Sequence, residues 1–280
     1  MPRSIPKGPL RTALLAVAAL GLAGADEETG AGPEAGQIDA IPLDAAAVKR
    51  RWHARLDSRH FTASISLEMN LGGLRETREL SVWRDDGGGD TERVMVRFES
   101  PPDLRNVALL YLEHGEQPND YFLYQPATRR IRRLPETVAN QDVYGIDLEF
   151  LGFGVAQNEP TEIESMTRVR LKGRGTYRLV ERATRSNSRF DRRSTWLDSE
   201  TFLALRTEHE RRGQIVMSAE VSGVREVQGV PTPIKVAFRR LDSDRAVELM
   251  VRSVDYEAEI PESYFTAMAL LRSRLKLESQ

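Results

Sequence analysis

The stretch that decides the fold is FTASISLEMNL, residues 61–71. Apolar and polar residues alternate along it, and an alternation of period two places every apolar side chain on one face of a β-strand. Gly72 and Gly73 follow at once and predict a tight turn into a second strand over 74–84. The β region therefore opens with an antiparallel hairpin that has one apolar face.

The same alternation returns along most of the remaining chain, in short segments separated by glycine or proline turns. We expect about ten or eleven strands in one continuous antiparallel sheet. Apolar residues at helical spacing predict one helix over 41–56 and another over 261–277, whereas 134–160 has neither period and predicts an apolar loop or a short helical excursion over the sheet. The fold class is mainly β with flanking helices. The segments with strand alternation after the hairpin are 94–98, 107–113, 121–125, 129–134, 169–171, 177–179, 203–205, 215–221, 234–238 and 247–251.

The first 25 residues have the three parts of a secretory signal peptide. Three cations precede an apolar run over 13–22, and Ala-Gly-Ala follows at 23–25 as a cleavage site. The apolar run is half the length of about 20 residues that a helix needs to cross a bilayer. We therefore expect an exported chain that begins near Asp26, with a flexible leader over 26–40 and a single domain over 41–280.

Composition argues against several classes of protein. The 40 Lys and Arg nearly balance the 42 Asp and Glu, so no basic field points to nucleic acid. The chain has no Cys, which excludes disulfides, thiolate nucleophiles and cysteine zinc sites. The four His lack the spacing of a metal-binding pair on a helix, and no nucleophile elbow or phosphate loop is present. The sequence predicts no catalytic residue, no metal and no cofactor, so we expect that the protein is not an enzyme.

Four arginines lie close together on a predicted strand: Arg129, Arg130, Arg132 and Arg133. With two cations on each face, the strand can hold a lipid headgroup phosphate or an acidic partner surface. The alternative is an edge strand whose charges prevent self-pairing. The sequence leaves both interpretations open.

A sheet of this size exposes an apolar face that helices must cover or that must curve around on itself. Two helices and one loop provide a small cover, which predicts an incompletely filled apolar concavity. Such a cavity suits an apolar ligand such as an acyl chain. The alternative is that side chains fill the space. The predicted cavity-lining residues are Ile65, Leu67, Met69, Leu80, Val82, Val94, Val96, Phe98, Met217, Phe238 and Leu249.

Several blocks of the sequence resemble the LolA-like outer-membrane lipoprotein-sorting proteins. The blocks are VMVRFESPPD at 94–103, NVALL at 106–110, YFLYQPA at 121–127, RRIRRL at 129–134 and GIDLEF at 145–150. The resemblance implies an incomplete antiparallel barrel wrapped around helices, with a hydrophobic cavity for acyl chains. It also implies a periplasmic, monomeric protein that takes lipid or lipoprotein acyl chains and passes them to an outer-membrane acceptor. In some members an inner-membrane exporter of the resistance-nodulation-division type is a partner.

Three functions are compatible with these observations. The first is a non-enzymatic periplasmic carrier that shelters acyl chains and transfers them between envelope partners. The second is a periplasmic sensor or regulator on the same fold that binds a lipid or a lipoprotein and signals to a membrane partner. The third is an envelope hydrolase, for which no nucleophile and base can be paired from the spacings. The carrier is the function that we favour.

Overall fold

The computed structural model describes residues 44–55, 60–86, 91–114, 117–135, 142–143, 146–147, 160–186, 188–241, 243 and 245–272. The expected signal peptide, the leader and most of the 134–160 segment lie outside the described residues. Within the described ranges, no helix is both long and apolar enough to cross a bilayer.

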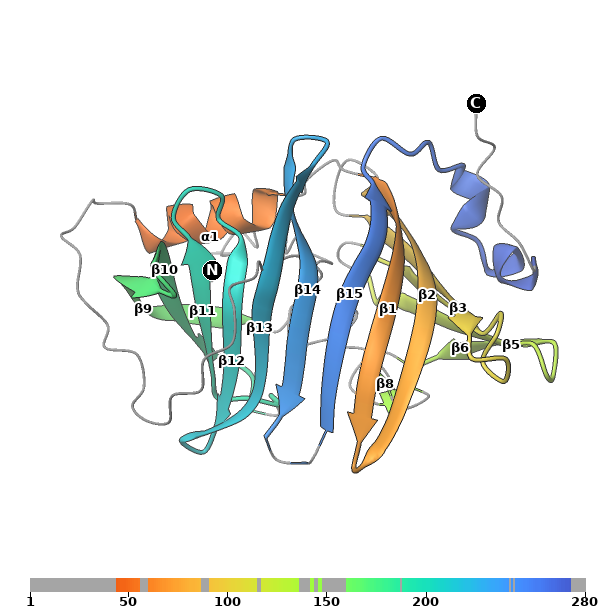
Figure 1. The fold of residues 1–280 in the computed structure, drawn as a ribbon, viewed down its shortest axis with the longest axis horizontal. Coiled ribbons are helices and arrows are strands. Elements are labelled where there is room, and N and C mark those ends of the chain that lie inside the picture. Colours follow the sequence, from red (N-terminus) through yellow and green to blue (C-terminus); the bar gives the residue numbers. More distant parts are fainter. Residues whose placement is uncertain are drawn as a thin grey trace, which may run out of the picture.

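Thirteen strands form one antiparallel sheet, in which β1 lies between β2 and β15 (Figure 1). The sheet is curved and unclosed, because β6 and β9 are at opposite ends of the strand order. The prediction of one large antiparallel sheet is confirmed, with more strands than the expected ten or eleven. The strands are β1 (Phe61–Leu71), β2 (Leu74–Asp86), β3 (Glu92–Ser100), β4 (Ala108–Leu112), β5 (Asp120–Gln125), β6 (Arg130–Leu134), β9 (Thr161–Leu171), β10 (Arg174–Ala183), β11 (Arg192–Asp198), β12 (Ala204–Arg211), β13 (Gln214–Val227), β14 (Val230–Arg240) and β15 (Arg245–Asp255).

The first hairpin has the register that the alternation predicts. Ile65 lies opposite Leu80 and Ala63 opposite Val82, so apolar residues of both strands share one face. The turn needs glycine, because Gly72 and Gly73 adopt φ angles of +68° and +94°, which residues with a Cβ rarely adopt. Within the segment 134–160, the structure describes only the short strands β7 (Asp142–Val143) and β8 (Ile146–Asp147) and the ends of the segment.

Two rows of direct cross-strand partners identify the inner, concave face of the sheet, since such partners point to the same side. One row crosses β5 to β1 through Leu123, Leu109, Val96, Val82 and Ala63. The other crosses β1 to β10 through Met69, Val247, Phe238, Ala219, Thr207, Thr195 and Leu179.

Helix α1 (Ala45–Ala54) packs on the inner face at the β9 end of the sheet. Asp44 caps it, since the Asp44 carboxylate accepts a hydrogen bond from the Ala46 N–H at 3.2 Å. Val48 is fully buried in a cluster with Tyr177, Leu179 and Leu197. The prediction of a helix at this end of the domain is confirmed, over a shorter range than 41–56.

The C-terminal segment differs from the predicted helix over 261–277. It forms two short 3-10 helices, η3 (Glu262–Tyr264) and η4 (Ala267–Leu271), and the residues after 272 lie outside the described ones. Thr266 separates them, because it is extended and its hydroxyl caps a new turn at the Ala269 N–H. Phe265 and Leu270 pack with Trp83 and Met95 on the outer face of the sheet. One helix thus lies inside the curve and these turns outside it, and the expected wrapping of the sheet around several helices stays a prediction.

Candidate functional site

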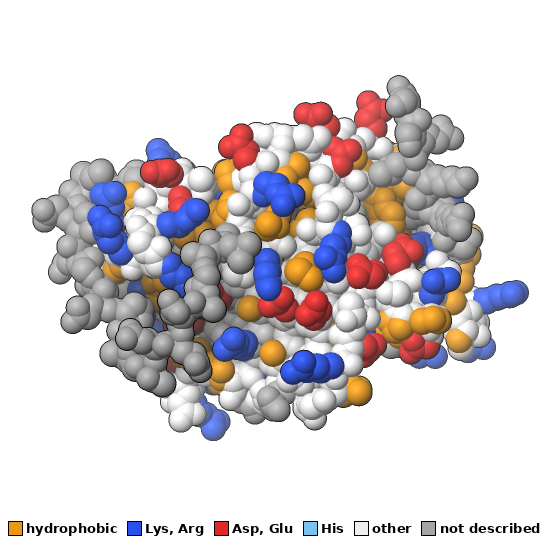
Figure 2. Space-filling model, in the orientation of Figure 1, with side chains coloured by type: hydrophobic (Ala, Val, Ile, Leu, Met, Phe, Trp, Pro, Cys, Tyr) orange, Lys and Arg blue, Asp and Glu red, His pale blue; other side chains and the backbone are white. Residues whose placement is uncertain are grey.

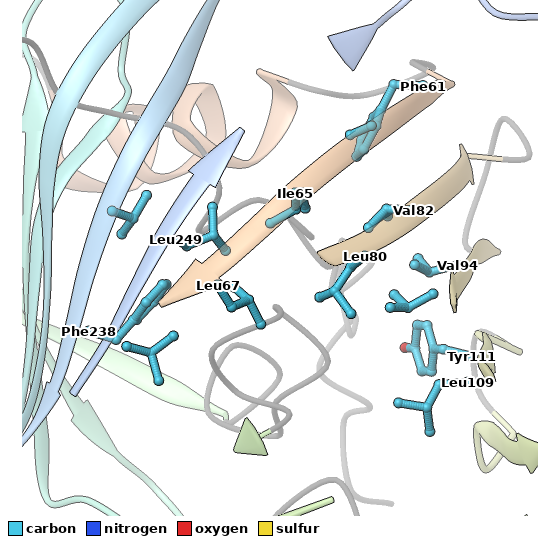
Figure 3. Close-up of a cluster of buried hydrophobic side chains, with 14 of the residues drawn as sticks. Phe61, Ile65, Leu67, Leu80, Val82, Val94, Leu109, Tyr111, Phe238 and Leu249 are labelled. Carbon is cyan, nitrogen blue, oxygen red and sulfur yellow. The ribbon is translucent and has the colours of Figure 1, made fainter. Parts of the chain in front are cut away.

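The inner face carries one continuous apolar cluster, which we call the inner cluster (Figure 3). It extends from β5, with Leu123, to β12, with Leu205, and it also includes Leu171 at the end of β9. All eleven residues predicted from the sequence to line a cavity belong to it, and each is at most 8% exposed. These eleven are Ile65, Leu67, Met69, Leu80, Val82, Val94, Val96, Phe98, Met217, Phe238 and Leu249.

Aromatic residues that the sequence analysis did not select complete the inner cluster. The Phe61 and Tyr256 rings meet edge to face with centroids 5.7 Å apart, and the Tyr111 and Tyr121 rings lie 5.1 Å apart. Strand alternation on β4 and β5 was a signal that could have identified Tyr111 and Tyr121, since Leu109 and Leu123 belong to the same row. Tyr256 follows the last strand and carries no such signal.

Two buried ion pairs lie on the inner face beside the apolar cluster. Arg84 pairs with Glu92, and both side chains are 3% exposed. Arg78 donates from Nη2 to Glu76 Oε2 at 2.9 Å, and its guanidinium lies 6.0 Å from the centre of the Phe98 ring. The hydrogen bond from Arg78 lowers the pKa of Glu76. The face is thus apolar in its middle and has paired charges at its polar positions.

Glu92 titrates far from its ordinary range. Burial raises the pKa of Glu92 to about 7, against the opposing effect of Arg84. The carboxylates of Glu113 and Asp86 add to this rise. The Arg84 and Glu92 pair therefore changes charge within the physiological pH range.

A second buried charge cluster holds α1 on the sheet. The Glu181 carboxylate is fully buried and accepts hydrogen bonds from Lys49 Nζ at 2.5 Å, Arg193 Nη2 at 2.7 Å and Thr161 Oγ1 at 2.6 Å. Burial, the largest single effect, raises its pKa, but Arg193 and Lys49 outweigh that effect and lower the pKa to about 2. Trp52 of α1 stacks under the Arg193 guanidinium at 5.5 Å. These contacts are structural and leave no open position for a ligand.

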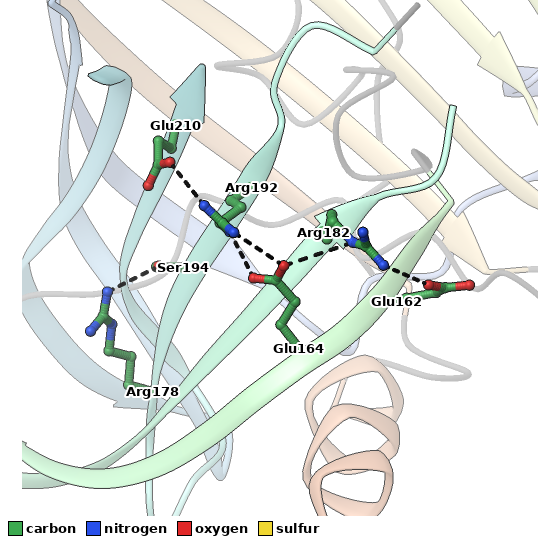
Figure 4. A network of polar contacts seen from close by, with 7 residues as sticks. All are labelled: Glu162, Glu164, Arg178, Arg182, Arg192, Ser194 and Glu210. Carbon is green, nitrogen blue, oxygen red and sulfur yellow. Dashed lines mark hydrogen bonds and ion pairs between the residues drawn. The ribbon is translucent and has the colours of Figure 1, made fainter. Parts of the chain in front are cut away.

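The outer face of the same strands is covered by exposed ion pairs (Figure 4). Arg192 donates to Glu164 at 2.7 Å and to Glu210 at 3.4 Å, and it therefore joins strands β9, β11 and β12. Exposed pairs of this kind are weak individually. The outer face is thus polar where the inner face is apolar.

The four predicted contact arginines lie at the end of the sheet. Arg130, Arg132 and Arg133 are exposed on β6, which has β5 as its one neighbour in the described sheet. Arg133 Nε donates to Asp120 at 2.6 Å, on the face opposite Arg132. The prediction that Arg129 lies on the strand is wrong, because Arg129 lies in the preceding turn with a φ of +50°. The four arginines are close in sequence, but they are distributed over the two faces of β6 and the preceding turn.

Two hollows on the sheet, of about 280 and 340 Å³, are lined mainly by polar residues. A cavity of about 110 Å³ lies beside Leu171, Leu205 and Val221 of the inner cluster and is below the few hundred Å³ of ordinary ligand pockets. Among the described residues, no group of three or more His, Asp or Glu is placed to hold a metal ion. The inner cluster is therefore the main candidate site of the described structure.

Comparisons with known proteins show the family and the fold of the chain. A family model described as "Uncharacterized protein" matches residues 90–272. No curated protein matches the sequence. Solved structures match the fold with probability 1.00.

Three of these structures cover most of the chain. A domain from Vibrio parahaemolyticus that is named for outer membrane lipoprotein sorting has a TM-score of 0.71 and 19% identity, and the match covers 82% of this chain and 100% of that one. A DUF1329 family protein from Desulfovibrio piger has a TM-score of 0.69 and 18% identity, covering 81% and 97%. A LolA superfamily protein from Nitrosomonas europaea has a TM-score of 0.58 and 13% identity, covering 80% and 98%.

Proposed function

Because the chain belongs to the family whose model spans residues 90–272 and has the fold of the LolA-like lipoprotein-sorting proteins, we propose that it is a non-enzymatic periplasmic carrier. Its inner face shelters the acyl chains of lipids or lipoproteins. The carrier passes them between envelope partners, with an inner-membrane exporter of the resistance-nodulation-division type as donor and an outer-membrane site as acceptor. It works as a monomer after removal of its signal peptide.

The observation that carries the proposal is the continuity of the inner cluster across the sheet. Apolar side chains face the same side from β5 to β12, and the polar side chains that interrupt them on the described strands include two ion pairs, Thr207 and His209. A hydrocarbon chain that enters between these buried side chains gains about 0.8 kcal/mol for each methylene that leaves water. The inner cluster offers no directional groups for a polar substrate, so it favours cargo by its apolar character alone.

The arginines of β6 provide a place for the polar end of the cargo or for a partner. Arg130 and Arg132 lie on the side of β6 that continues the inner face, since Arg132 is opposite Leu123. Both are exposed, so they can reach a phosphate while the acyl chain contacts the inner cluster. Arg133 faces away from it and is better placed for an acidic partner surface, and Arg129 lies in the preceding turn.

A substitution that fills space over the inner face without adding charge tests the proposed function. Ala219 is half-buried in the row of inner-face residues, and its neighbour Ser218 points to the outer face. We expect Ala219→Phe to reduce uptake of a fluorescent fatty acid several-fold, and Ser218→Phe to leave uptake unchanged. Thermal unfolding of both variants shows whether each remains folded.

Mass spectrometry of solvent extracts from the purified protein provides a second readout that needs no variant. A co-purified lipid supports the carrier. A folded Ala219→Phe protein with undiminished uptake, together with an extract free of lipid, would contradict it.

A further inference from the structure

Three neighbouring hairpins of the sheet turn at the same end. In the strand order β2, β1, β15, β14, β13, β12, Leu71 lies opposite Leu74 and also opposite Arg245. Arg245 pairs in turn with Arg240, and Arg211 with Gln214. We call the three turns, with residues 71–75, 211–215 and 239–245, the hairpin rim. It is the lower edge of the sheet in Figure 1.

Each turn of the hairpin rim exposes a large apolar side chain. Five such side chains are at least 41% exposed among the described residues, and three of them are at the rim: Leu74 at 64%, Leu241 at 58% and Ile215 at 41%. Adjacent turns are two strands apart, or about 10 Å. The three side chains therefore form a row of separate apolar tips and not a continuous patch.

The rim is also the basic end of the molecule. Its three segments hold six arginines and two aspartates, Asp242 and Asp244, which lie outside the described residues. Arg75, Arg211, Arg212 and Arg239 are exposed. The tips are therefore surrounded by cations that point into solvent.

The opposite end is acidic. Strand β15 runs from the rim at Arg245 for eleven residues, about 33 Å, to Asp255. The segment 255–262 that follows contains four carboxylates and no cation, and all four are exposed. Acidic side chains gather at the upper edge in Figure 2, and basic ones reach the lower edge. The charge is thus separated along the strands.

We infer that the hairpin rim docks on the surface of an anionic lipid bilayer. The basic rim is attracted to lipid phosphates while the acidic end is repelled, so the field orients the strands across the membrane surface. The apolar tips then enter the boundary between headgroups and acyl chains. A protein partner would need a continuous complementary surface, which a row of separate tips does not offer. The inference goes beyond the proposed function, because it holds whatever the inner face binds.

Vesicle sedimentation of the purified chain tests the inference. We expect binding to vesicles of phosphatidylglycerol and phosphatidylethanolamine, little binding to phosphatidylcholine vesicles, and weaker binding as salt is raised. At low salt, Arg75→Gln/Arg211→Gln/Arg212→Gln should weaken binding about a hundredfold, since each arginine near an anionic surface contributes roughly 1 kcal/mol. Leu74→Ser/Leu241→Ser should weaken it at least about tenfold.

Matched substitutions elsewhere serve as controls. Met268→Ser/Leu271→Ser removes two apolar side chains from η4 that are 68% and 42% exposed, and Arg225→Gln/Arg252→Gln removes exposed cations away from the rim. Both controls should bind vesicles like the parent chain. Fatty acid uptake by the rim variants should be unchanged, which separates failure of this inference from failure of the carrier proposal.

Three results would overturn the inference. One is an absence of binding to anionic vesicles, and another is an equal loss of binding in rim and control variants. The third is a change in self-association of the rim variants, measured by sedimentation equilibrium, with vesicle binding intact. That last result would assign the rim to a second copy of the chain.

Discussion

At the scale of single residues, Glu92 couples the stability of this structure to pH near neutrality. The carboxyl group is buried beside Arg84 on the inner face, and burial raises its pKa from 4.5 to about 7. Between these values the folded protein binds a proton that the unfolded chain has lost. The contribution of Glu92 to stability is therefore fully present below pH 4.5 and is lost as the pH rises through about 7.

A Glu92→Gln variant should lack this dependence. Relative to the variant, the parent chain should lose about 3 kcal/mol of unfolding free energy between pH 4.5 and 8, because a shift of one unit corresponds to about 1.4 kcal/mol. Urea unfolding at several pH values measures the difference. Glu226→Gln, at an exposed position, is the control, and parallel pH curves for the parent chain and Glu92→Gln would refute the coupling.

At the scale of elements, Glu181 has the opposite effect on the pH dependence of stability. Its ion pairs hold helix α1 on the sheet. Its pKa is lowered to about 2, so its contribution to stability is present above pH 4.5 and is lost as the pH falls through about 2. We expect Glu181→Gln to destabilise the protein by about 3 kcal/mol at neutral pH, since it leaves Lys49 and Arg193 without their carboxylate. The difference from the parent chain should shrink towards pH 2.

The release of α1 gives this prediction a local readout. Trp52 lies on α1 beside Arg193, so its fluorescence should change at lower urea concentration in Glu181→Gln than in the parent chain. Glu162→Gln, at an exposed position on neighbouring β9, should leave both measurements unchanged. If Glu181→Gln unfolds like the parent chain at neutral pH, then α1 is held by its apolar contacts alone.

Elements also show what the sequence can and cannot predict. The alternation over 61–71 predicted β1, its partner and the face that each apolar side chain occupies, because one face is buried along the entire strand. Strand β11 was missed, since its inward residues Arg193 and Thr195 are polar and Arg193 is neutralised by Glu181 from another strand. Spacing of apolar residues cannot reveal a charge that is buried because of a distant partner.

The ends of elements were harder to predict than their middles. Helical spacing from Phe265 to Leu271 suggested one helix, but Thr266 starts a new turn and leaves Met268 and Leu271 exposed. Arg129 was assigned to a strand, although the turn places it at positive φ. The pairing of Glu92 with Arg84 joins β2 to β3 across a turn that the sequence indicates only as glycine-rich, so the raised pKa of Glu92 could not be foreseen.

At the scale of the whole molecule, the inner cluster connects distant parts of the chain into one core. It includes residues from β1 to β5 and from β12 to β15. A core that is shared in this way favours a single cooperative transition. The single domain over 41–280 stays a prediction, and a shared core of this kind favours it.

Two tryptophans near opposite ends of the sheet can test that cooperativity. Trp83 packs on the outer face of β2, whereas Trp196 lies on β11 between the guanidinium groups of Arg178 and Arg206. Each variant keeps one of these tryptophans and has Phe at the other tryptophan positions. In each variant, we expect the urea unfolding midpoint measured by fluorescence to coincide with the midpoint measured by far-UV circular dichroism. Midpoints that separate would show that the two ends of the sheet unfold independently.

The unclosed sheet has a consequence for the range of cargo sizes that the proposed carrier can accept. A closed barrel has a radius fixed by its strand number and stagger. In this sheet β6 and β9 are the ends of the strand order and no row of hydrogen bonds joins them in the described chain. The curvature can therefore tighten or relax by small changes in twist between neighbouring strands, with every backbone ladder intact. The width of the concave face can in this way adjust to a narrow or a wide cargo molecule.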